Sequence, residues 1–129
     1  MAKTDPTFKQ FAETVKRFYQ ALKDKDWAAT YQMRTKEFRY DVSRELYLTS
    51  MSRDGKNWAL DDYKILGIVS YGGSNGYTAV RLIMEFNEGG MISYNAVWWK
   101  KDGTSWFCDH AGPSKLALFN STRIPCEAE

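Results

Sequence analysis

Few residues in this chain could carry acid–base chemistry, and His110 comes first because it is the only histidine. A histidine titrates near neutral pH and can act as a general acid or base. The neighbouring Asp109 cannot readily orient it, because adjacent side chains in a strand point to opposite faces. The sequence therefore favours a hydrogen-bonded histidine at a pocket rim or on the surface over a catalytic one.

Metal, phosphate and nucleophile chemistry have little support. A single histidine argues against a catalytic zinc, which needs several nitrogen or sulfur ligands. Cys108 and Cys126 match no metal-binding spacing. The glycine-rich segment 72–76 joins two expected strands and opens no helix, so it is a turn and not a phosphate loop. No serine or cysteine nucleophile motif is present. We expect neither a metal nor a cofactor.

Two other charged features have competing interpretations. Asp61 and Asp62 could share a proton, but consecutive side chains diverge, and aspartate before a strand is typical of a solvated loop. Arg81 lies in the middle of an expected strand. Facing a pocket, it would suit a carboxylate ligand; facing outward, it would pair with Glu85 or Glu88 in water. The opposite face of this strand is purely apolar, which favours the outward orientation.

The first half of the chain has the periodicity of helices. Asp5 and Pro6 form a helix start. Apolar residues then follow at helical spacing, which predicts one amphipathic helix from about Pro6 to Lys23. Asp26 is the expected N-cap of a short second helix. A third helical segment is predicted around Phe38, Val42 and Leu46, with Tyr47 and Met51 nearby.

The second half alternates and predicts strands. In the first strand we expect Tyr63, Ile65, Val69 and Tyr71 to share one face, with Gly67 as a candidate bulge. In the second, one face carries Thr78, Val80, Leu82, Met84 and Phe86. Two aromatic runs between Met91 and His110 then flank Asp102-Gly103, which is a strong hairpin signal.

The register of that hairpin decides which side chains share a face. A two-residue loop at Asp102-Gly103 would place Trp99 opposite Trp106, Val97 opposite Cys108, and Asn95 opposite His110. A three-residue loop would instead place Trp99 opposite Phe107 and Trp98 opposite Cys108. We favour the two-residue loop, because aspartate-glycine prefers the tight turn.

Helices followed by strands joined through short turns predict an α+β fold, with the N-terminal helices packed on a curved, mainly antiparallel sheet of about four strands. The length of 129 residues suits a single domain over 1–129, with a core over about 5–112 and a C-terminal tail over 113–129. Such a sheet can enclose a cone-shaped pocket.

This order of elements resembles the nuclear transport factor 2-like superfamily, the cone-shaped fold of ketosteroid isomerase and polyketide cyclases. The more specific part is Val97-Trp98-Trp99-Lys100-Lys101-Asp102-Gly103 followed by Trp106, which looks like the last hairpin of many members. The resemblance implies a ligand pocket inside the cone but carries over no catalytic residue. The candidate pocket residues are Tyr19, Trp27, Tyr31, Asn95, Trp99, Trp106 and His110.

Composition narrows the function further. Eighteen Lys and Arg residues stand against sixteen Asp and Glu, without a basic block, so nucleic-acid binding has no electrostatic support. No apolar run is long enough for a membrane span. The leading hypothesis is a domain that binds a small apolar or weakly acidic ligand, or a protein partner, without demonstrable catalysis. The alternatives are a cofactor-free isomerase, cyclase or dehydratase, and an extracytoplasmic accessory domain of a cell-envelope protein.

Assembly and compartment follow from the same residues. Aromatic residues on both faces of the sheet (Trp98 and Phe107 on one, Trp99 and Trp106 on the other) cannot all be covered by one helix layer, which predicts a homodimer through the sheet. A native Met1 would indicate a cytoplasmic protein. A removed signal peptide together with a Cys108–Cys126 disulfide would indicate an extracytoplasmic one.

Overall fold

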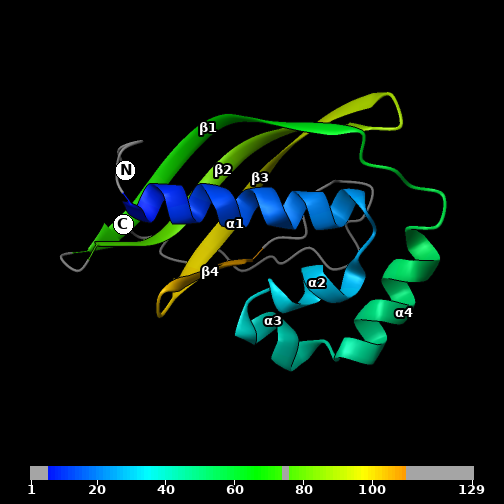
Figure 1. Ribbon diagram of the computed structural model, residues 1–129, viewed down its shortest axis with the longest axis horizontal. Helices are drawn as coiled ribbons and strands as arrows, with labels where there is room; N and C mark the ends of the chain where they lie inside the picture. Colours follow the sequence, from blue (N-terminus) through cyan, green and yellow to red (C-terminus); the bar gives the residue numbers. More distant parts are fainter. Residues whose placement is uncertain (1–5, 74–75, 110–129) are drawn as a thin grey trace.

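The computed structural model describes residues 6–73 and 76–109, with side chains described for 8–72 and 78–109. The helices are α1 (Pro6–Lys23), α2 (Trp27–Gln32), α3 (Lys36–Asp41) and α4 (Arg44–Asp54). The strands are β1 (Asp62–Gly73), β2 (Gly76–Glu88), β3 (Met91–Asp102) and β4 (Ser105–Cys108). These strands form one antiparallel sheet in the order β1-β2-β3-β4, and α1 crosses its face (Figure 1). The predicted α+β class is confirmed.

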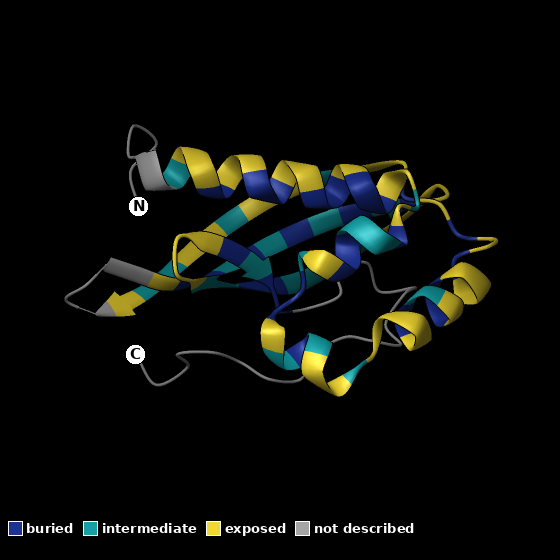
Figure 2. Ribbon diagram, turned by 60° about the horizontal axis from the view of Figure 1, so that its bottom comes forward, coloured by how far each residue is buried: buried dark blue, intermediate teal, exposed yellow. Residues whose placement is uncertain are grey.

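Helix α1 has the predicted bounds and covers the central strands. Its buried side turns toward the sheet (Figure 2). Phe11 and Phe18 both meet the ring of Trp99 edge-on, with ring centroids 5.9 Å and 5.3 Å away. Burying each such side chain contributes about 1.5–3 kcal/mol, so this stripe is a main attachment of the helix layer to the sheet.

The helices after α1 are set by capping side chains. Asp26 accepts a hydrogen bond from the Ala29 amide, which confirms the predicted cap of α2. The prediction of one third helix was wrong, because the chain forms α3 and α4 with an extended Val42 between them. Ser43 accepts from the Leu46 amide and starts α4 afresh. The helical spacing of Phe38, Val42 and Leu46 continues across the break, so it could not reveal that Ser43 starts a new helix.

The inner face of β2 is as predicted, whereas β1 corrects the sequence. Val80, Leu82, Met84 and Phe86 are all fully buried. In β1, Ile65 pairs with Met84 but Gly67 pairs with Ile83, so the extra residue at a bulge is Leu66. The bulge reverses the side-chain alternation. Tyr63 and Ile65 therefore face the helices, and Val69 and Tyr71 face the other way.

The last hairpin is tight, but its register is neither of the two considered. Trp99 pairs with Cys108 and Asp102 with Ser105, so the two-residue loop is Gly103-Thr104. Among these two, only Gly103 has a positive φ, +65°, which is the pattern of a type II′ turn. The shift relative to the favoured register is two residues, an even number. Trp99, Trp106 and Cys108 therefore still share the inner face, and all three are buried.

Candidate functional site

The predicted pocket residues are mostly packed in the core. The exposed fractions are 0% for Tyr19 and Trp99, 2% for Trp106, 6% for Tyr31 and 8% for Trp27. Phe18 joins the first two through ring contacts of 5.3 Å each. In the same core, the ring of Tyr31 contacts those of Phe38 and Tyr47, and Trp27 lies beside Trp58. Asn95 is half-buried on β3. His110 lies outside the described residues.

Three of these core residues carry polar atoms without a hydrogen-bond partner among the described residues. They are Tyr19, through its hydroxyl, and Trp99 and Trp106, each through Nε1. Burial raises the pKa of the Tyr19 hydroxyl well above its usual value, and the neighbouring Cys108 thiol raises it further. Tyr19 therefore stays a neutral hydroxyl, able to donate to an acceptor oxygen. A buried donor without a partner costs about 1–3 kcal/mol.

Arg34 is a buried cation that no pattern in the sequence singled out. It is fully buried where α2 leads into α3, and its Nε donates to the Cys108 carbonyl at 3.3 Å. Its guanidinium lies 3.7 Å from the centroid of the Phe38 ring. The Tyr47 hydroxyl is 2.9 Å from Thr30 Oγ1, and burial raises the pKa of Tyr47 although Arg34 partly offsets this. Arginine is usually solvent-exposed, so only the fold could place it here.

A surface groove of about 530 Å³ lies between α1, the end of α2 and β4. We call it the α1–β4 groove. Its lining residues are Lys9, Gln10, Glu13, Thr14, Arg17, Gln32, Met33, Ser105, Trp106 and Phe107. One of the seven predicted pocket residues, Trp106, thus lines it. Five of the ten lining residues lie on α1.

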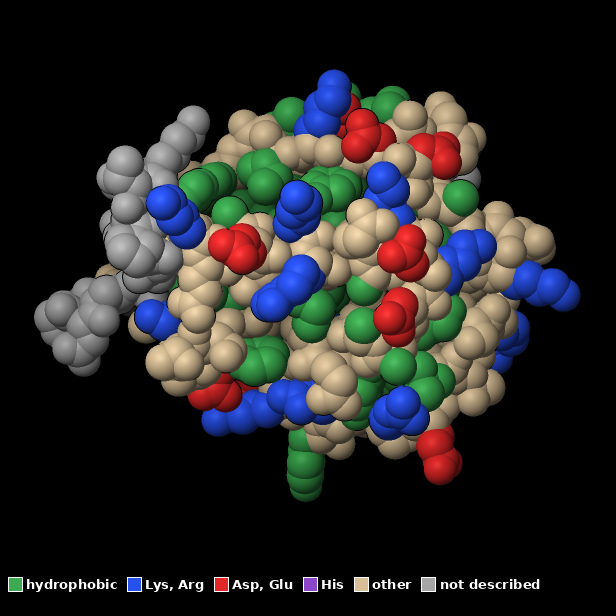
Figure 3. Space-filling model, in the orientation of Figure 1, with side chains coloured by type: hydrophobic (Ala, Val, Ile, Leu, Met, Phe, Trp, Pro, Cys, Tyr) green, Lys and Arg blue, Asp and Glu red, His purple; other side chains and the backbone are tan. Residues whose placement is uncertain are grey.

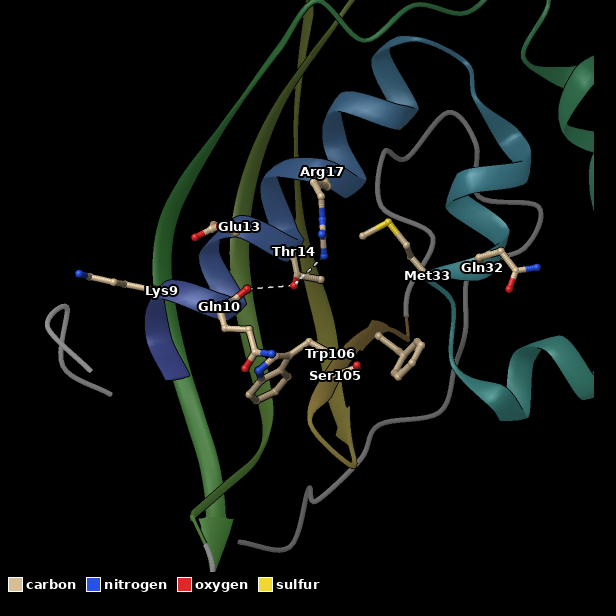
Figure 4. A pocket seen from close by; sticks show the side chains of 10 residues that line it. Lys9, Gln10, Glu13, Thr14, Arg17, Gln32, Met33, Ser105 and Trp106 are labelled. Carbon is tan, nitrogen blue, oxygen red and sulfur yellow. Dashed lines mark hydrogen bonds between the residues drawn. The ribbon is translucent and has the colours of Figure 1, made fainter. Parts of the chain in front are cut away.

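The side chains of the groove are positioned by local contacts (Figure 4). Gln10 Nε2 donates to the Thr104 carbonyl at 3.0 Å, which ties the start of α1 to the β3–β4 loop. Thr14 Oγ1 donates to the Gln10 carbonyl at 2.9 Å and accepts from Arg17 Nη2 at 3.4 Å. These bonds hold Arg17 over Thr14, facing Met33, whereas Lys9 points away (Figure 4).

The groove combines charge with apolar surface. No ion pair is found for Arg17 within the described ranges, although Glu13 lies four residues earlier on the same helix. Phe107 and Met33, both partly exposed, provide apolar surface in the same groove. A guanidinium can bind a carboxylate through charge-assisted hydrogen bonds. The arrangement is therefore suited to a ligand with one acidic group and an apolar body.

The remaining chemistry-bearing residues lie apart from this groove. Asp61 and Asp62 are exposed. Arg81 faces outward, as favoured, but it lies 5.9 Å from the centroid of Trp98, while Glu85 pairs with Lys64. Asp109 is buried and accepts from Thr35 Oγ1 at 3.3 Å. Over 6–73 and 76–109 there is no cluster of three His, Cys, Asp or Glu side chains that could hold a metal.

Three further observations concern the cysteines, the distribution of surface charge, and membrane-spanning helices. Cys108 is buried, and Cys126 lies outside the described residues. On the face that carries α1, basic and acidic side chains are interspersed (Figure 3). No helix in the described part of the chain is long and apolar enough to cross a membrane.

Comparison with known proteins indicates no function for this chain. Neither the models of known protein families nor the curated proteins include a match to this chain.

Proposed function

We propose that this protein is a nuclear transport factor 2-like binding domain that holds a weakly acidic ligand with an apolar body in the α1–β4 groove. The order of helices followed by an antiparallel sheet supports the family. The observation that carries the function is the Arg17 guanidinium, which has no ion pair among the described residues and lines the same groove as Phe107 and Met33.

Binding without catalysis is favoured by the chemistry of the lining. Its one carboxylate is Glu13, and its other polar side chains are amides, hydroxyls and cations. A general base needs hydrogen-bond reach to a proton of a positioned substrate. Glu13 instead points away from the space between α1 and Met33 (Figure 4). Recognition therefore explains the arrangement with fewer assumptions than turnover does.

The direct test is titration with 4-phenylbutyrate, an aromatic carboxylate, followed by NMR of the ¹⁵N-labelled protein. We expect saturable shifts at groove residues and weaker shifts with the neutral 4-phenylbutanamide. Arg17→Gln should weaken carboxylate binding by at least about tenfold, because a hydrogen bond to a charged group contributes about 1.5–3 kcal/mol.

The matched control is Lys16→Gln, which removes one positive charge from an exposed position of the same helix outside the groove. Lys16→Gln should bind like the unchanged protein. Equal weakening by both variants would indicate a general charge effect. The absence of saturable shifts in the unchanged protein would contradict the proposed function itself.

We also propose that the predicted homodimer forms through the sheet face opposite α1. This face carries Ile92 and Tyr94, 50% and 64% exposed, and Val69, 40% exposed. Exposed apolar side chains on an uncovered sheet face commonly mark protein interfaces. Tyr94→Glu should convert a dimer into a monomer in light scattering, whereas Tyr40→Glu, at a 90% exposed position on α3, should not. A monomeric unchanged protein would contradict this proposal.

A further inference from the structure

The main chain of β4 points to a more specific ligand for the α1–β4 groove. We infer that the groove takes an extended peptide with an acidic side chain, which pairs with the main chain of Trp106. This inference rests on the proposed function, because it names the ligand class for the same groove. Three observations support it. The main-chain groups of Trp106 face away from β3, the segment that pairs with Cys108 does not reach Trp106, and Arg17 lies on the wall of the groove.

At the outer edge of β4, the main chain of Cys108 is already hydrogen-bonded to a neighbouring segment. The Cys108 amide donates to the Met33 carbonyl at 2.7 Å, and the Cys108 carbonyl accepts from the Thr35 amide at 3.2 Å. The main chain of Cys108 therefore faces away from β3. Main-chain groups alternate in direction along a strand, so those of Trp106, two residues earlier, face the same way.

The hairpin geometry gives the same direction independently. In a two-residue hairpin the pair that closes the loop exchanges hydrogen bonds, here Asp102 with Ser105. The next pair, Lys101 with Trp106, is then a non-hydrogen-bonded pair, in which the two residues exchange no main-chain hydrogen bonds. The amide and carbonyl of Trp106 are thus turned from the sheet toward the side on which Met33 and Thr35 lie.

The segment that pairs with Cys108 does not extend as far as Trp106. Arg34 and Cys108 form a single isolated parallel bridge. Before Met33 the chain is the helix α2, which ends at Gln32. Among the described residues, no strand other than β3 therefore lies beside Trp106, which borders the groove with Gln32 and Met33 on one side and α1 on the other. Addition of a strand to an open edge is a common mode of peptide recognition.

Charge decides what kind of peptide fits. Arg17 lies on the α1 wall, where its donor groups face the groove (Figure 4). A strand placed beside Trp106 would direct alternate side chains to the two walls. An Asp or Glu side chain on the α1 side would then meet Arg17, and apolar neighbours would meet Met33. A small organic acid could use Arg17 but could not supply both a main-chain donor and an acceptor to Trp106.

The test uses the full-length ¹⁵N-labelled protein and an equimolar mixture of end-capped pentapeptides with Glu fixed at the centre and the other four positions varied. The readouts are NMR shifts and hydrogen exchange of the Trp106 amide. We expect shifts at Arg17, Met33 and Trp106, and at least about tenfold slower exchange at Trp106, because a strand bond protects that amide. A mixture with Gln at the centre should bind more weakly.

A backbone control separates pairing from charge. The same peptides, with every backbone nitrogen methylated, keep the acidic side chain but lose the main-chain donors, and their methyl groups prevent the close approach of two strands that the Trp106 amide needs to reach a peptide carbonyl. They should leave Trp106 exchange unchanged. Equal protection by both mixtures would overturn the strand-pairing inference, as would no protection from the Glu mixture.

The two proposals can fail separately. Binding of 4-phenylbutyrate without any peptide effect at Trp106 would overturn the peptide inference and leave the acidic-ligand function standing. Binding of neither probe would overturn both. Peptide-induced shifts confined to the sheet face around Tyr94 would assign peptide binding elsewhere and also overturn the inference.

Discussion

Trp99 of β3 lies directly opposite Cys108 of β4, and this pairing fixes the hairpin that closes the sheet. It places both residues on the inner face, where each is fully buried. It also places Gly103 and Thr104 at the loop and turns the Trp106 main chain toward the α1–β4 groove. One register therefore determines both part of the core and the candidate site.

The first prediction tests that loop. Gly103 has φ +65°, and a Cβ there would meet nothing within 4 Å, so Gly103→Ala should cost only backbone strain, about 1–2 kcal/mol of unfolding free energy. Gly67→Ala is the control, because its φ lies outside the left-handed region and its Cβ would make an ordinary 3.7 Å contact with Ile83. Urea unfolding measures both. Equal effects of the two variants would contradict the loop assignment.

The second prediction concerns the unpartnered Tyr19 hydroxyl. Tyr19→Phe should leave stability unchanged or raise it by up to about 1 kcal/mol, because it removes an unsatisfied buried donor. Tyr47→Phe should lower stability by about 1 kcal/mol, because the Tyr47 hydroxyl bonds to Thr30. Urea unfolding compares the two. Clear destabilisation by Tyr19→Phe would show that a water or ligand binds this hydroxyl.

The third prediction is loss of stability at alkaline pH. Burial raises the pKa values of Tyr19 and Tyr47 in the folded state above the usual value of 10.0. Above pH 10 the unfolded chain releases these protons while the folded protein keeps them, so unfolding becomes more favourable as pH rises. Each tyrosine contributes a slope of up to about 1.4 kcal/mol per pH unit between its two pKa values.

Unfolding experiments between pH 9 and 11 measure this slope. Tyr47→Phe should make it shallower, whereas the same substitution at Tyr40, which is 90% exposed, serves as the control for loss of a hydroxyl. If the Tyr47 and Tyr40 variants shared the slope of the unchanged protein, the buried tyrosine would not be the cause.

The fourth prediction concerns Arg34. Its replacement by Ala should cost about 3 kcal/mol or more, since it removes the packing on Phe38 and the donor to Cys108. Arg34→Met should cost less, because it keeps much of the buried volume and Thr35 still donates to the Cys108 carbonyl. Thermal unfolding ranks the variants. An Arg34→Ala protein as stable as the unchanged one would contradict a structural role.

The sequence determined the features that are written locally. The apolar spacing from Pro6 to Lys23 specifies α1, because a helix repeats every 3.6 residues and its stripe needs no other information. Asp26 caps α2 through an amide three residues away. Alternation in β2 specified its buried face for the same reason. The α+β class follows from the order of these local patterns.

The tertiary structure decided everything that depends on relative placement. The bulge at Leu66 reversed Val69 and Tyr71, and the two-residue shift moved Trp99 from Trp106 to Cys108, because pairing energy is summed over a whole ladder. The buried position of Arg34 and the α1–β4 groove arise only when α1, α2 and β4 meet. These segments are far apart in the chain, and no local period encodes the space between them.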